Sequence, residues 1–431
     1  MKILLVNKFL HQVGGAETSF LHTRELLRRR GHEVIDFSMA HPGNLASDQA
    51  AYFAKQRSYA PGANRFRRVG DAASAVYSFE ARRALARLLD DHRPAVAHLH
   101  SVYHQLTLGV VDELFERDIP IVQTLHDYKI ACPAYTLFTE GAPCRRCVGS
   151  TTLHAVKHRC IKGSAAASAL AAVEMTLARR RGTFSRIQRF IAPSRFAASV
   201  ALSAGAAPER VKYLPYFIPP EEMVEPSSVS REATIFFGGR LEETKGLRQL
   251  LTAFEHVSPA ATLRIAGWGP LEEVVVEAAK RRPNVVFLGR LDRDAVRREL
   301  ASARAMVLPS VWEDNCPLVM LEARARATPV IVSDRGGPPE FVEDGVDGFI
   351  VNPDDAQTLA RAIEQLVFDP ALAAAFGAKG RQRLLQDHQE GSHYAGLMSI
   401  YEEAMNAPGL NDRRNRPDVS PTRRKVVRTR R

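Results

Sequence analysis

Short apolar runs alternate along this chain with segments whose apolar residues recur at helical spacing, which is the pattern of βαβ units and parallel sheets. In the first half, the runs that predict strands are 3–6, 33–37, 96–99, 119–125 and 190–192. In the second half, they are 234–237, 262–266, 285–288, 305–308, 329–332 and 348–351. The pattern therefore predicts an α/β protein with one doubly wound, Rossmann-like parallel sheet in each half.

A proline-rich stretch separates the two halves. Pro215, Pro219 and Pro220 stand close together, and prolines at that density cannot continue a helix or a central strand. We therefore expect a first domain at residues 1–214, a linker at 215–231 and a second domain at 232–390. A helical pattern at 391–406 has no strand behind it and can cross back to the first domain.

The net charge of +11 is concentrated at the C-terminal end of the 431-residue chain. Residues 411–431 contain nine basic and two acidic residues, which is seven of the eleven net charges. Such a segment cannot bury enough apolar surface to order itself, so we expect a disordered basic tail at 407–431. The chain as a whole, with 45% hydrophobic and 25% charged residues, has an ordinary globular composition, which excludes a fibrous or wholly disordered protein.

The charge pattern also bears on where the protein acts. No apolar run approaches the roughly 18 residues that span a bilayer, and the run at 3–6 is too short for a signal-peptide core. We expect a cytoplasmic protein that associates peripherally with the anionic inner face of the membrane. The basic residues that suggest this are the tail and Lys55, Arg57, Arg65, Arg67 and Arg68. A tail without a partner is the alternative, and a nucleic-acid partner is not expected.

Two glycine-containing loops follow predicted strands and suit a phosphate group. Gly14 and Gly15 precede a helical pattern, where backbone N–H groups and the helix dipole favour an anion. Gly239 and Arg240 end the strand at 234–237, and Lys245 follows a few residues later, so both cations can converge on one diphosphate. A plain tight turn at Gly14 and a pair of solvated surface cations are the alternatives.

A third loop carries carboxylates. It follows the strand at 305–308 and contains Asp314, and Glu322 comes eight residues later on the helix that the loop leads into. Glu322 can accept hydrogen bonds from the two vicinal hydroxyls of a ribose. Asp314 can face a sugar, but it suits a helix cap equally well.

Taken together, these motifs resemble the retaining glycosyltransferases of family four, or glycosyl transferases group 1, which have the GT-B fold. The matching marks are Gly14-Gly15, His126-Asp127, Gly239-Arg240 with Lys245-Gly246, Gly267-Trp268-Gly269-Pro270, and two carboxylates separated by seven residues. The resemblance covers residues 1 to about 405. It implies two Rossmann-like domains that hold a nucleotide sugar between them.

The resemblance also implies roles for single residues. Arg240 and Lys245 would bind the donor diphosphate, Glu322 the ribose, and His126 the transferred sugar. Gly14, Gly15, Gly239, Gly267 and Gly269 would shape the donor site. Without the resemblance, His126 is as readily a histidine hydrogen-bonded within its own loop. The family has Glu where this chain has Asp314, so a nucleophilic role for Asp314 is doubtful and we expect it to position sugar hydroxyls.

The predicted function is therefore a hexosyltransferase-like enzyme of polysaccharide or cell-envelope biosynthesis. It would move a sugar from a UDP- or GDP-sugar to a polysaccharide, glycolipid or lipid-linked acceptor. Two fixed cations can replace a divalent ion at the diphosphate, so we expect no catalytic metal. The alternatives are a sugar-nucleotide epimerase on the same fold and a non-catalytic nucleotide-sugar-binding protein.

Four of the five cysteines are clustered in the region 132–160, which we expect to form an insertion in the first domain. Cys132, Cys144, Cys147 and Cys160 have the spacing C-x11-C-x2-C-x12-C. A CxxC pair lets two thiolates reach one ion, and two more cysteines complete a tetrahedral structural zinc site. Ordinary reduced thiols and a redox pair at Cys144 and Cys147 are the alternatives, and His154 or His158 could replace one ligand.

Overall fold

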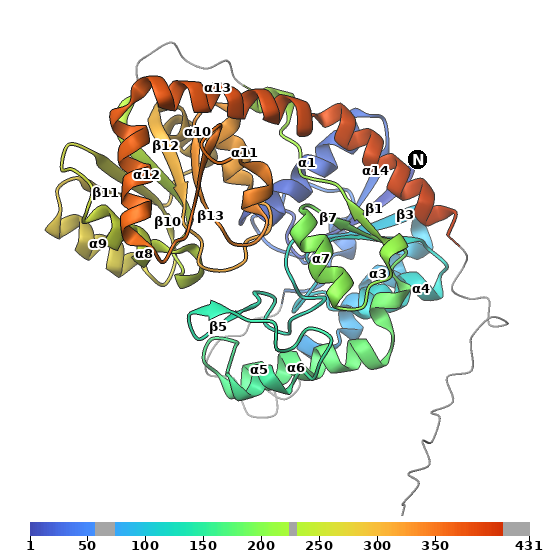
Figure 1. Ribbon diagram of the computed structural model, residues 1–431. Helices are drawn as coiled ribbons and strands as arrows, with labels where there is room; N and C mark the ends of the chain where they lie inside the picture. The colour runs from blue at the N-terminus through green and yellow to red at the C-terminus, as the bar shows by residue number, and fades with distance from the viewer. Residues whose placement is uncertain (57–73, 224–230, 408–431) are drawn as a thin grey trace, which may run out of the picture.

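A computed structural model describes residues 1–56, 74–223 and 231–407. Within these residues the chain forms two α/β domains that lie side by side (Figure 1). Most of the basic stretch predicted to face a membrane, including Arg57, Arg65, Arg67 and Arg68, lies outside the described residues. The same holds for the basic tail beyond residue 407 and for residues 224–230 of the linker.

The first domain is built on a six-stranded parallel sheet of order β2-β1-β3-β4-β7-β8. Its strands are β1 (Lys2–Val6), β2 (Glu33–Phe37), β3 (Val96–Leu99), β4 (Ile121–Thr124), β7 (Arg189–Ala192) and β8 (Val211–Tyr213). Its helices are α1 (Gly15–Arg29), α3 (Phe79–Asp91), α4 (Gly109–Glu116), α5 (Leu153–Lys157), α6 (Ala165–Arg180) and α7 (Arg195–Ser203). A hairpin of β5 (Phe138–Thr139) and β6 (Ala142–Pro143) lies in the loop between β4 and α5.

The second domain has a six-stranded parallel sheet of order β11-β10-β9-β12-β13-β14. Its strands are β9 (Glu232–Arg240), β10 (Thr262–Trp268), β11 (Val285–Gly289), β12 (Ala303–Leu308), β13 (Val330–Ser333) and β14 (Gly348–Val351). Its helices are α8 (Leu247–Phe254), α9 (Glu272–Arg281), α10 (Arg293–Ser302), α11 (Leu318–Ala325), α12 (Ala356–Phe368) and α13 (Pro370–Asp387). The order reverses between β9 and β12, and ligands of such sheets bind outside the strand ends at that point.

Each sheet has an apolar core on both faces, which confirms the predicted doubly wound α/β architecture. In β1, Leu4 and Val6 belong to one core, whereas Ile3 and Leu5 belong to the other. This division follows from the alternation of side chains along a strand. The second sheet divides in the same way, with Ile235 and Phe237 of β9 on one face and Phe236 on the other.

The last helix, α14 (Glu390–Met405), packs on the first domain although it follows the second in sequence. Leu397, Ile400 and Tyr401 join the core that contains Ile3 and Leu5. The Tyr401 hydroxyl is 2.8 Å from Nδ1 of His98 on β3. In Figure 1, α13 and α14 form one edge of the molecule and run from the second domain to the first. The final helix therefore ties the two domains together.

No helix among the described residues is long and apolar enough to cross a membrane.

Candidate donor site between the domains

A cavity of about 650 Å³ lies where the strand-end loops of the two domains meet. This volume is within the range of ligand pockets in proteins. The first domain contributes the loop before α1, and the second contributes the ends of β9 and β10 together with α10 and α11. The predicted site residues that line the cavity are Gly14, Gly15, Gly239, Arg240, Lys245, Gly267 and Glu322.

The first-domain wall of the cavity is the N-terminus of α1. Gly14 is the N-cap residue of this helix and has an extended backbone, so it makes no side-chain cap hydrogen bond, and the buried Glu17 carboxylate of the first turn hydrogen-bonds the backbone of Gly14 and Glu17. A Cβ atom at Gly15 would have no neighbour within 4 Å among the described residues. Gly14, Gly15 and Thr18 of this first turn line the cavity, so the helix N-terminus, where anions bind in many proteins, faces it.

The loop after β9 is held against the next strand-end loop by a glycine. Gly246 has a φ angle of 69°, in the left-handed region, and it directly precedes α8. A Cβ atom at this position would lie 1.7 Å from the carbonyl oxygen of Pro309, which follows β12. Only glycine permits this approach, and the approach fixes Lys245 beside the Asp314 loop.

Lys245 forms an ion pair with Asp314 in the structure. The distance from Nζ to Oδ2 is 2.5 Å, and the ammonium group also lies 5.0 Å from the ring centre of Trp312. Asp314 is buried and accepts further hydrogen bonds from the Ser310 hydroxyl and from the amide of Asn315. The carboxylate therefore holds Lys245 in place, and Asp314 itself is not among the residues that line the cavity.

Arg240 lies at the end of β9 and is more exposed than Lys245. Its guanidinium group pairs with Glu242 and lies 4.4 Å from the ring centre of Trp268 at the end of β10. Arg290 lies 5.6 Å from the same ring. Trp268 thus brings two cations to one side of the cavity, and all three residues line it.

Glu322 lies on α11 and belongs to a network that joins both domains. Its carboxylate is 3.5 Å from the Arg293 guanidinium, which also pairs with Glu222 and lies 2.7 Å from Nε2 of His22 on α1. Burial raises the pKa of Glu322, although the charge of Arg293 opposes this rise. Arg293 therefore links the predicted ribose-binding carboxylate to the contact between the domains.

Glu222 has the opposite pKa shift within the same network. Burial raises its pKa, but the hydrogen bond from His22 and the charges of Arg293 and Arg297 outweigh burial and hold the pKa at about 2. The distances from its Oε1 atom to His22 and Arg297 are 3.0 and 3.2 Å. Glu222 is therefore ionised at neutral pH and lies between an N-terminal helix and a helix of the second domain.

His126 lies outside the cavity lining, and both of its ring nitrogens already have partners. Nε2 is 2.8 Å from Nδ1 of His100, and Nδ1 is 2.6 Å from the Tyr216 hydroxyl. Burial lowers the pKa of His126 to about 3, so the ring is neutral at physiological pH. The predicted contact of His126 with the transferred sugar would require one of these hydrogen bonds to break, and it stays a prediction.

Gly269 and the four clustered cysteines are predicted site residues that do not line the cavity. Gly269 has a φ angle of 154°, and a Cβ atom there would lie 2.6 Å from the carbonyl oxygen of Leu241. It therefore shapes the turn behind Trp268. The four clustered cysteines line a separate small pocket in the first domain and are free thiols.

Sequence analysis gave no role of their own to two residues of the site. Trp268 stands inside the glycine motif, and an aromatic residue between two glycines at a strand end was an available signal. Arg293 lies one residue after the Asp292 N-cap of α10 and carries no motif. Its place beside Glu322 follows only from the packing of α10 against α11.

Two doubly wound domains with a cavity between the ends of their strands are the features of the GT-B class of proteins. The family model for Glycosyltransferase Family 4 matches residues 13–222, and the model for Glycosyl transferases group 1 matches residues 220–383. The two matches meet at the linker and together extend from the loop before α1 to α13. The chain belongs to this glycosyltransferase family, group 1 family 4.

Curated relatives match only part of this chain. An α-maltose-1-phosphate synthase of Mycobacterium tuberculosis is 39% identical over 166 residues, which are 35% of this chain and 43% of that protein. A glycogen synthase of the same organism is 35% identical over 161 residues, which are 36% of this chain and 39% of that protein. The chain thus matches about two fifths of the length of these relatives.

Solved structures match nearly the whole chain at low sequence identity, and they show the fold. The Anabaena protein Alr3699/HepE in complex with UDP has a TM-score of 0.66 and 17% identity, covering 93% of this chain and 100% of that chain. Sucrose-phosphate synthase of Thermosynechococcus elongatus has a TM-score of 0.69 and 17% identity, covering 94% and 100%. The predicted GT-B fold is therefore confirmed.

Proposed function

We propose that this protein is a retaining glycosyltransferase that takes its sugar from a UDP- or GDP-sugar. The observation that carries the proposal is that Arg240, Lys245 and the N-terminus of α1 face one cavity from opposite domains. Two cations and a helix N-terminus are what a diphosphate group requires.

The donor would bind with its diphosphate between these groups. As the bond from the sugar to the diphosphate breaks, negative charge grows on the leaving phosphate. Arg240 and Lys245 would stabilise that charge, as preorganised cations do in a site shielded from water. Lys245 would then share its charge between Asp314 and the phosphate. Since these cations are part of the chain, we propose that turnover requires no divalent metal, and added Mg²⁺ or Mn²⁺ should not raise the rate.

The nucleoside would occupy the part of the cavity between α11 and β10. Glu322 would accept hydrogen bonds from the ribose hydroxyls, with Arg293 orienting its carboxylate. Trp268 offers an aromatic surface at the same end of the cavity. A nucleotide-sugar donor agrees with HepE, a protein of the same fold, which has been solved with UDP, with UDP and glucose, and with UDP-glucose.

The transferred sugar would keep its anomeric configuration. The acceptor hydroxyl would attack the anomeric carbon from the face that the diphosphate leaves, and an oxygen of the leaving phosphate would take the hydroxyl proton. This step follows from membership of the family. We propose that Asp314 acts in it through Lys245, which it holds at 2.5 Å, in place of a nucleophile's role.

The acceptor would be a polysaccharide, a glycolipid or a lipid-linked sugar. Relatives support this class, since a glycogen synthase and a GDP-mannose-dependent phosphatidylinositol monomannoside mannosyltransferase are among them. The second of these names both a GDP-sugar donor and a lipid acceptor, which keeps both open for this chain.

A donor screen tests the proposal. The purified full chain is incubated with UDP- and GDP-sugars, and slow release of UDP or GDP is measured. We expect release from one donor. In the product formed with an added acceptor, the transferred sugar should keep the anomeric configuration that it has in the donor. We expect Arg240→Ala to abolish the release. Interconversion of one nucleotide sugar into another, or binding without release from any donor, would contradict the proposal.

A further inference from the structure

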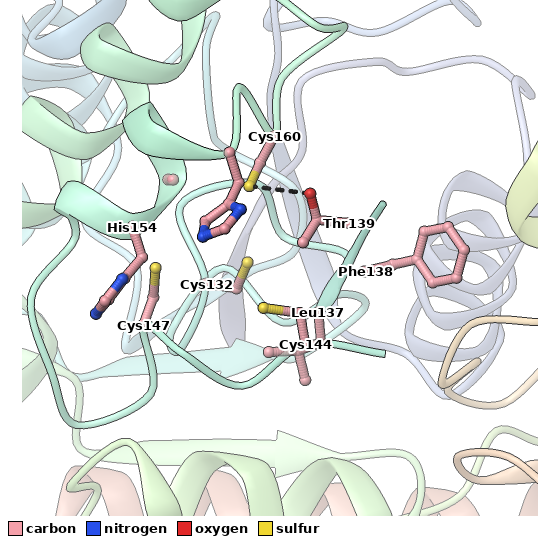
Figure 2. A pocket seen from close by; sticks show the side chains of 10 residues that line it. Cys132, Leu137, Phe138, Thr139, Cys144, Cys147, His154 and Cys160 are labelled. Carbon is pink, nitrogen blue, oxygen red and sulfur yellow. Dashed lines mark hydrogen bonds between the residues drawn. The ribbon is translucent and has the colours of Figure 1, made fainter. Parts of the chain in front are cut away.

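Four cysteines from separate parts of the first-domain insertion line one pocket. Cys132 follows β4, Cys144 and Cys147 follow the β5–β6 hairpin, and Cys160 follows α5. Figure 2 shows their side chains around a single space. The Cys160 thiol donates a hydrogen bond of 3.5 Å to the Thr139 hydroxyl. His154 and His158 line the same pocket. Residues up to 28 positions apart in the sequence are thus collected at one point.

The segment around these cysteines has little regular structure to stabilise it. Between β4 and α6 it contains only the hairpin of two-residue strands and the five-residue helix α5. Its backbone turns sharply at several non-glycine residues with left-handed φ angles, namely Tyr135, Leu137, Glu140, Arg159 and Lys162. Small loop-rich units of this kind usually need a disulfide or a metal ion to hold them.

A disulfide does not provide that support, since all five cysteines are free. The backbone groups of Leu137 and Ala134 hydrogen-bond Cys132, and Cys144 donates its own amide to the Leu137 carbonyl at 2.6 Å. The chain therefore wraps around the first cysteine and brings the CxxC pair toward it. Amide groups that surround a cysteine in this way orient the sulfur and support a bound metal.

We propose that Cys132, Cys144, Cys147 and Cys160 bind one structural zinc ion. Four thiolates in a closed shell are the usual ligands of such an ion, and the C-x2-C spacing of Cys144 and Cys147 lets two of them share it. Among the described residues, no three or more His, Cys, Asp or Glu side chains already lie close enough together to hold a metal ion. The sulfurs would therefore close on the ion as it binds, and their protons would leave to solvent as the Zn–S bonds form.

The ion would also support the contact between the domains. Arg145 lies between Cys144 and Cys147 and donates to Glu313 of the second domain at 2.9 Å. Glu313 directly precedes Asp314, which holds Lys245. The same guanidinium lies 5.2 Å from the ring centre of Phe196. With zinc bound to Cys144 and Cys147, the turn between them would hold Arg145 against the loop that carries Asp314.

Metal analysis of the full chain, purified without added metal and without chelator, tests the inference. We expect about one zinc ion per chain by elemental analysis. A mercurial reagent that modifies thiols should release this zinc to a colorimetric zinc indicator. Replacement by Co²⁺ should give the intense visible bands of a tetrahedral tetrathiolate site. These measurements use the unaltered chain, so they do not depend on how well a variant folds.

Variants identify the ligands. Cys144→Ser and Cys147→Ser should each reduce the zinc content, whereas Cys316→Ser should not, because Cys316 is buried elsewhere at the start of α11. His158→Ala should also retain zinc. The inference would be overturned by iron in place of zinc, by four thiols that react freely without releasing metal, or by a disulfide detected by mass. It would also be overturned by loss of zinc in His158→Ala with retention in a variant of one of the four cysteines.

Discussion

At the scale of single residues, the donor site depends on charges whose positions other charges determine. Lys245 is held by Asp314, Glu322 by Arg293, and Arg240 by Trp268 and Glu242. The motifs identified Lys245, Glu322 and Arg240 from residue type and spacing. The motifs also contained Asp314 and Trp268 but gave Trp268 no role, and they did not identify Arg293, which comes from another helix.

Lys245→Ala should lower kcat by about 10² to 10³, because one cation that stabilises the leaving phosphate is removed. The measurement is steady-state release of the nucleoside diphosphate with the donor found in the screen. Arg248→Ala is the matched control, since Arg248 is exposed, pairs with Glu243 and lies outside the cavity lining. Equal rates for wild type and Lys245→Ala would refute the role of this ammonium group.

Glu322→Gln should weaken nucleoside diphosphate binding by roughly tenfold, because a neutral amide is a weaker acceptor for the ribose hydroxyls and leaves Arg293 without its partner. The measurement is titration calorimetry with UDP and GDP. Glu343→Gln, an exposed carboxylate of the same domain, should bind as the wild type does. Unchanged affinity in Glu322→Gln would show that the ribose binds elsewhere.

At the scale of elements, the strand ends and the turns after them position the site. Helix α6 shows how residue type determines where a helix begins and ends. Ser164 caps its first turn, and Gly182 follows its end with a φ angle of 63°. Serine at an N-cap and glycine just past a helix end are the residue types that favour these two positions. The three-residue strand β8 and the β5–β6 hairpin were missed, because runs this short carry no period that distinguishes them from loops.

Gly246→Ala should lower the free energy of unfolding by ~2 kcal/mol or more, since a left-handed backbone is strained by a side chain and the Cβ would clash with Pro309. Thermal unfolding measures the effect. In Gly391→Ala the new methyl has no neighbour within 4 Å and lies in α14, so a small gain in stability is expected. A Gly246→Ala midpoint equal to that of wild type would contradict the close approach of the two loops.

At the scale of the whole molecule, several sets of contacts join the two domains that form the donor cavity. Glu340 of the second domain accepts the amides of Arg195 and Phe196 at the start of α7, at 2.7 and 2.6 Å. Asn315 bonds both Ser194 and the carbonyl of Leu125. The Glu222 network adds a third contact, and α14 adds a fourth. Apart from the largely apolar packing of α14, the two domains therefore meet through polar groups.

Protonation of Glu222 should weaken this association in acid. Its pKa in the folded chain is about 2, against an ordinary value of 4.5, so the carboxylate stabilises the fold above pH 4.5. That contribution is lost as the pH falls toward 2. Thermal midpoints measured from pH 7 to pH 3 should fall more steeply for wild type than for Glu222→Gln.

At neutral pH, Glu222→Gln should itself cost about 3 kcal/mol, because Arg293 and Arg297 lose the carboxylate between them. Glu221→Gln is the matched control, since Glu221 lies in the same turn but is exposed. Identical pH profiles for wild type and Glu222→Gln would show that the network does not hold the domains together.

The amino-acid sequence by itself determined the two parallel sheets, the break between them and the glycine and cation motifs at the strand ends, because each depends on residues close together in the chain. Only the tertiary structure decided which of these groups meet. It paired Lys245 with Asp314, placed Arg293 beside Glu322, occupied both nitrogens of His126 and laid α14 on the first domain. The physical reason is that hydrophobic periodicity and turn chemistry are local, whereas these contacts join residues as far apart as His98 and Tyr401.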